Sequence, residues 1–96
     1  MNRNIGHTIK IEIKKLSEME LTTLNVYSWP IWSCEVSEFP WTYSDKESCY
    51  ILEGKVIVTT DHEEVTIELG DFIIFPKGLS CHWHILKPIR KHYSFE

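Results

Sequence analysis

Apolar and polar residues alternate in short runs along most of this chain. From Thr8 to Lys14 an isoleucine occupies every second position, which predicts a β-strand with one buried face. Further runs of this kind, bounded by Gly, Pro or acidic turn residues, predict a series of short strands. They are expected at 31–43 with a kink at Pro40, and at 47–52, 55–60, 65–69, 72–75, 81–86 and 89–95.

The segments between these runs predict turns and one helix. Glu53-Gly54 is expected to turn one strand into the next, and Lys87-Pro88 to separate the last two strands. Ser17 and Glu20 have the spacing of a capping box, which predicts a short helix that ends near Leu24. Many short strands at regular spacing indicate an all-β sandwich or barrel.

Composition limits the class of protein. A chain of 96 residues with four Trp, four Tyr and four Phe is expected to form one domain, with a strand and helix in 1–28 and a barrel core in 29–96. Its net charge of −4 and the lack of a basic patch argue against nucleic acid as a partner. No long apolar run or signal-peptide pattern is present, and the three Cys form no Cys-x-x-Cys pair, so we expect no membrane partner and a cytoplasmic protein with reduced thiols.

Two stretches carry a recognisable pattern. Trp41 to Gly54 has six residues between Glu47 and its final Gly, and Gly70 to Cys81 contains Pro-x-Gly after five intervening residues. Together they resemble the two sequence motifs of the cupin family, and the resemblance extends over most of the chain, from Trp29 to Tyr93. It is closest to the small single-domain cupins grouped with ureidoglycine aminohydrolase and the ethanolamine-utilisation cupins. The resemblance implies an RmlC-like jelly roll, the double-stranded β-helix barrel.

The resemblance also implies a metal site that this chain has lost. Cupins usually hold a metal with three His and one carboxylate, ligands that suit transition metals. Trp41, Tyr43 and Cys81 stand at the three His positions, and only Glu47 remains. Trp is not a ligand, Tyr has an ordinary pKa of about 10, and Cys binds only as a thiolate. We therefore expect neither a metal nor another cofactor.

Alternation along the strands predicts which side chains share the pocket that the resemblance implies. Ile89, Tyr93 and Phe95 form the apolar face of the last strand, and Lys91 shares this face with them. An inward Glu47 must be paired or lose its charge, and Lys91 is the candidate partner. His82 and His84 are expected to point outward, where they form either a solvated face or a surface metal pair. The expected pocket residues are Trp41, Tyr43, Glu47, Cys49, Cys81, Trp83 and Lys91.

These residues are compatible with three functions. The first is a metal-free cupin that binds a small polar metabolite between aromatic walls. The second is an enzyme of the ureidoglycine aminohydrolase type that acts on a ureide or amino compound, with Glu47, Tyr43 and Cys81 as candidate catalytic residues. The third is a structural or interaction module whose aromatic residues and thiols only fill the barrel. The isoleucine-rich strand at the N-terminus also predicts a homodimer.

Overall fold

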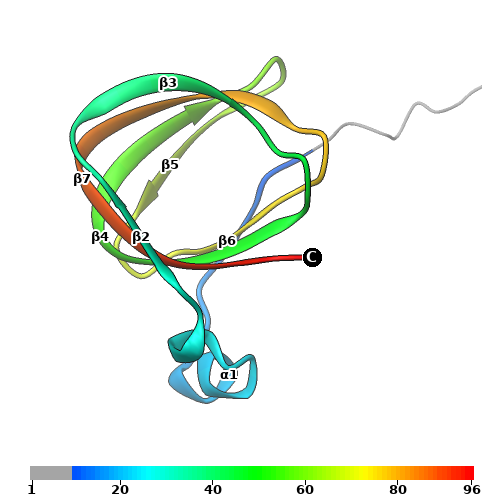
Figure 1. Cartoon of the computed structure of the whole chain (residues 1–96), viewed down its shortest axis with the longest axis vertical. Helices are drawn as coiled ribbons and strands as arrows, with labels where there is room; N and C mark the ends of the chain where they lie inside the picture. The colour runs from blue at the N-terminus through cyan, green and yellow to red at the C-terminus, as the bar shows by residue number, and fades with distance from the viewer. Residues whose placement is uncertain (1–9) are drawn as a thin grey trace, which may run out of the picture.

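The computed structural model describes residues 10–96 and confirms an all-β fold with one short α-helix. Figure 1 shows the strands curving around a common interior, with the helix outside the barrel at one end. The helix is α1 (Glu18–Thr23), and the 3-10 turn η1 (Val26–Ser28) follows it. The strands are β1 (Glu12–Lys14), β2 (Ile31–Cys34), β3 (Ser37–Thr42), β4 (Glu47–Thr59), β5 (Glu64–Glu68), β6 (Phe72–Phe75) and β7 (Ser80–Phe95).

The two long strands β4 and β7 hold the barrel together (Figure 1). They pair with each other, and each also pairs with two short strands, all antiparallel. β4 carries β6 along its first half and β5 along its second half, whereas β7 carries β3 first and β2 later. The sheet order is β1-β6-β4-β7-β2, with β3 on β7 and β5 on β4. Because both long strands change partners along their length, the sheet closes around its inner face.

The turn predicted at Glu53-Gly54 is wrong, because β4 runs through it as an irregular ladder with β7. The register shifts between Ile51 and Val56, and Gly54 has a positive φ of 103° that only glycine adopts easily. A Cβ on Gly54 would lie 2.4 Å from the carbonyl oxygen of Pro88. The break predicted at Lys87-Pro88 is also wrong, because β7 runs through it. Pro88 has no N–H to donate to a neighbouring strand, and it lies where the β4–β7 ladder is already irregular.

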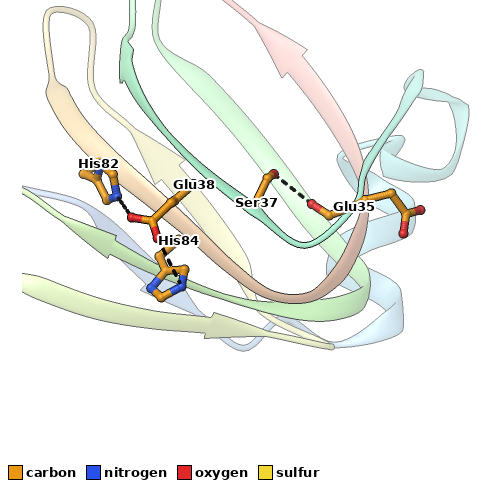
Figure 2. Close-up of polar contacts among 5 residues, drawn as sticks. All are labelled: Glu35, Ser37, Glu38, His82 and His84. Atoms are coloured by element: carbon orange, nitrogen blue, oxygen red, sulfur yellow. Dashed lines mark hydrogen bonds and ion pairs between the residues drawn. The ribbon is translucent and has the colours of Figure 1, made fainter.

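The single long strand predicted at 31–43 is two strands. β2 ends at Cys34 and β3 begins at Ser37, whose hydroxyl donates a hydrogen bond to the Glu35 carbonyl oxygen (Figure 2). The short connection changes which residues face inward. Trp32 and Phe39 both pack against the core, although an unbroken strand would put an even and an odd position on opposite faces.

The N-terminal strand is shorter than predicted. β1 covers only Glu12–Lys14 and pairs with β6, and the part of the prediction before residue 10 lies outside the described residues. Ile11 is buried but Ile13 is 39% exposed, so the expected buried isoleucine face is wrong at Ile13.

The predicted helix is confirmed, including its capping box: Ser17 and Glu20 each accept from the other's backbone N–H. A helix of this length depends on tertiary packing. Leu21 and Val26 supply that packing by burying themselves with Phe72 on the outer side of the barrel, separate from the main core. No helix within residues 10–96 is both long enough and apolar enough to span a membrane.

Candidate functional site

The barrel holds a cavity of about 250 Å³ whose rim, at Trp41 and Phe95, is exposed to solvent. Seven of the nine lining side chains are aromatic, and the other two are a carboxylate and an ammonium. They come from β2, β3, β4 and β7, together with the residue after β3. The lining residues are Trp32, Phe39, Trp41, Tyr43, Glu47, Trp83, Lys91, Tyr93 and Phe95.

Five of the seven residues expected in the pocket lie together around this cavity: Trp41, Tyr43, Glu47, Trp83 and Lys91. The other two do not line it. Cys49 is completely buried and Cys81 is 9% exposed, and both pack in the hydrophobic core. The alternation along β4 and β7 is as expected, but these two small side chains are buried in the core and do not reach the cavity.

The sequence interpretation missed Trp32 as a pocket residue. Trp32 is opposite Lys91 in the β2–β7 ladder, so its ring lies next to the ammonium. Treating 31–43 as one strand would have sent Trp32 outward. Tyr93 and Phe95 were expected on the inner face of the last strand, and both line the cavity, as does Phe39.

Glu47 and Lys91 form a buried ion pair at the cavity wall. The Lys91 Nζ donates to Glu47 Oε2 at 2.5 Å, and the two side chains are only 6% and 5% exposed. The ammonium also lies 4.9 Å from the Trp83 ring centroid and 5.1 Å from that of Trp32. Desolvating two charges is costly, and both the short hydrogen bond and the ring faces offset part of that cost. We call Lys91, Trp32 and Trp83 the ammonium cage.

Burial keeps the other candidate reactive groups protonated. The Tyr43 ring stacks on Phe75 with centroids 4.6 Å apart, and burial, reinforced by the charge of Glu47, raises the pKa of its hydroxyl. Burial raises the pKa of the Cys81 thiol to about 11, even though the Trp83 indole and Lys91 oppose the shift. Burial raises the pKa of the Cys49 thiol to about 12. At neutral pH these groups are therefore poor nucleophiles and poor bases.

The residues at the cupin ligand positions do not fit a transition metal. Trp41 has no donor for a metal, and Tyr43 and Cys81 hold their protons. Glu47 is already bound to the Lys91 ammonium, whose charge would repel a metal cation beside it. Within residues 10–96, no group of three or more His, Cys, Asp or Glu side chains could hold a metal ion.

His82 and His84 lie on the outer face of β7, each about 45% exposed on its side chain. Figure 2 shows Glu38 of β3 between them. The Glu38 carboxylate is 3.0 Å from His82 Nε2 and 3.8 Å from His84 Nε2. Both imidazoles thus face an acidic partner outside the barrel, and neither contributes to the cavity.

Comparison with known families and structures gives a consistent result. The model of the EutQ-like cupin domain matches residues 21–93. A solved DUF861-family protein from Thermotoga maritima is 51% identical, with a TM-score of 0.89, over 91% of this chain and all of that one. A search of curated proteins finds no match.

Two solved EutQ proteins are more distant. A putative ethanolamine utilization protein Q from Salmonella typhimurium is 28% identical over 68% of this chain and 53% of its own, with a TM-score of 0.62. The EutQ protein of Clostridium difficile is 20% identical over 88% of this chain and 66% of its own, with a TM-score of 0.63. At that identity the second likeness shows the fold alone.

Proposed function

The chain belongs to the family of EutQ-like cupin domains, and from this premise we propose that its cavity binds a small polar metabolite without a metal. The observation that carries the proposal is the space of about 250 Å³ left between aromatic walls around one polar pair. Mostly apolar cavities with a few convergent polar groups are the usual form of small-molecule sites. A barrel with a purely structural role would have no reason to keep such a space open.

The size of the cavity limits the ligand. A water molecule takes a share of about 30 Å³ in the liquid, so the cavity has room for about eight molecules of that size. A metabolite of roughly ten non-hydrogen atoms fits inside this volume, whereas a nucleotide or a coenzyme would extend beyond it. The aromatic rings supply contact area, and Glu47 and Lys91 supply orientation.

An enzyme that acts on a ureide or amino compound is the alternative function. Glu47 is the remaining candidate for its acid or base, because burial works against Tyr43 and Cys81 in that role. The chemistry implied by the aminohydrolase resemblance also depends on a metal, which the donor set here does not suit. Binding without turnover therefore accounts for the site with fewer assumptions.

Native mass spectrometry of the purified protein, followed by release of bound molecules in organic solvent, tests the proposal. We expect a bound small molecule in part or all of the protein population, and less than about a tenth of an equivalent of any transition metal per chain. Glu47→Gln should lower the occupancy, whereas Glu38→Gln on the outer face should not. The absence of a bound molecule, combined with no thermal shift across a library of small polar metabolites, would refute the proposal.

A further inference from the structure

The charge balance of the cavity restricts its ligand, provided that the proposed binding function holds. Among the nine lining residues only Glu47 and Lys91 carry charge, and they neutralise each other at 2.5 Å. A ligand with a net charge would bring an uncompensated ion against a wall that is mostly aromatic. Burying an unpaired charge is strongly unfavourable. An uncharged ligand avoids this penalty.

A cationic ligand meets a second obstacle. Aromatic ring faces attract ammonium groups, so a cavity walled by rings would normally favour a cation. In this barrel the protein's own ammonium occupies that place, with Lys91 within about 5 Å of the Trp32 and Trp83 ring centroids. A ligand ammonium would therefore find the cage filled and would be repelled by the charge already there.

The ion pair still offers hydrogen bonds to a neutral ligand. An ammonium has three N–H donors, and Lys91 gives one of them to Glu47 Oε2. An ionised carboxylate has about four acceptor positions, so Glu47 also has capacity left. A donor and an acceptor thus stand side by side at the cavity wall. The complementary ligand edge has an acceptor next to a donor, as in the carbonyl oxygen and N–H of an amide.

The walls favour a planar molecule. Phe39 and Trp83, which both line the cavity, stack on each other with ring centroids 6.1 Å apart and an angle of 11° between their planes. The Tyr43 ring is held in place by stacking on Phe75, with an angle of 9° between the two ring planes. Flat ligands stack on such ring faces in offset or edge-to-face geometry. We propose that the cavity binds a small, uncharged, planar molecule with a carboxamide or lactam edge, whose carbonyl accepts from Lys91 and whose N–H donates to Glu47.

Four probes with the same aromatic ring test this ligand class: benzamide, benzoate, benzylammonium and the zwitterion phenylglycine. They differ mainly in the charge of the polar group. Binding is followed by the indole N–H resonances of ¹⁵N-labelled protein, with Trp32 and Trp83 assigned by Trp→Phe variants. We expect benzamide to shift both resonances and to bind at least about tenfold more tightly than benzoate and benzylammonium. Phenylglycine has no net charge, but its ammonium is repelled by Lys91, so it should also bind more weakly than benzamide. A charged probe that binds as tightly as benzamide would overturn the proposal.

Variants of the pair give a sharper result. Glu47→Gln leaves an uncompensated ammonium, so the preference should change toward benzoate. Lys91→Met leaves a carboxylate, so it should change toward benzylammonium. Glu38→Gln is the matched control and should keep the wild-type order. An unchanged order in both pocket variants would contradict the assigned role of the pair. The wild-type panel needs no variant of the ion pair and decides the ligand class if either one fails to fold.

The outcome with no bound probe is also decisive when combined with the released molecule described above. A released molecule with an amide or lactam edge supports the ligand class. A released molecule without one overturns the class and leaves the binding function standing. No released molecule and no bound probe would overturn both.

Discussion

Removing one partner of the buried ion pair should destabilise the protein more than removing both. Lys91→Met leaves the Glu47 carboxylate almost fully buried without its counter-charge. Breaking a buried pair in this way costs about 3–5 kcal/mol. A chain of 96 residues has a free energy of unfolding of about 5–14 kcal/mol, so the folded state remains favoured in the variant over most of this range.

The cage makes the two single variants unequal. Glu47→Gln leaves the Lys91 ammonium between the Trp32 and Trp83 rings, and such contacts are worth about 0.5–2 kcal/mol. This variant should therefore lose about 1–2 kcal/mol less than Lys91→Met, which leaves Glu47 without an equivalent. In the double variant no buried charge remains, so its loss should be smaller than the sum of the single losses by at least about 2 kcal/mol.

Urea unfolding of the four proteins, followed by circular dichroism, measures this coupling energy. Glu53 and Arg90 provide a control, because they pair at 3.1 Å between the same two strands but are largely exposed. Their double-mutant cycle should give a coupling of only about 0.2–1 kcal/mol. If the cycle for the buried pair gave a coupling as small as that of the exposed pair, the burial attributed to Glu47 and Lys91 would be wrong.

Three further predictions concern other parts of the molecule. Gly54→Ala should lower the free energy of unfolding by at least about 2 kcal/mol, because positive φ and a contact with the Pro88 carbonyl both oppose a Cβ. Gly78→Ala, with a φ of 87° but open space, should cost only about 1 kcal/mol, and equal losses would argue against the contact. Iodoacetamide at pH 7 should label half-buried Cys34 before buried Cys81. Only the thiolate reacts, so Cys81 should react faster as the pH rises toward its pKa of about 11. Equal labelling of the two thiols at pH 7 would contradict this. Light scattering should give the mass of a homodimer, because the edge strand β1 is available for pairing with a second copy. A measured mass of 11.4 kDa, that of one chain, would refute this.

The strands were predictable from alternation because half-buried strands must alternate, and the motif around Glu47 identified the barrel. The strand boundaries were less predictable. Glu53-Gly54 is a turn by composition, and only the neighbouring backbone at Pro88 reveals it as a bulge inside β4. A local pattern contains no information about which strand passes alongside.

The sequence predicted which side chains of the candidate site point inward, but not which of them reach the cavity. Glu47 and Lys91 lie 44 positions apart. The resemblance placed Glu47 inward, and alternation along the last strand placed Lys91 on its inner, apolar face. Parity could not show that Cys49 and Cys81 are buried in the core, since that depends on how the surrounding side chains pack. It also failed for Trp32, because two residues without strand structure at Glu35 and Val36 change the face of everything before them.

The ammonium cage determines when the pocket acquires its cation. In a metal cupin the cation arrives from solution, so an apoprotein stage exists and the metal supply governs how much protein is ready. Here the cation is the end of a side chain on β7, and it takes its place when β7 pairs with β2 and β4. Folding of the chain therefore also places the ammonium in the pocket. If the pocket binds its ligand without a metal, as proposed above, chelators and metal starvation should leave binding unchanged, because the ammonium that pairs with Glu47 is part of the chain.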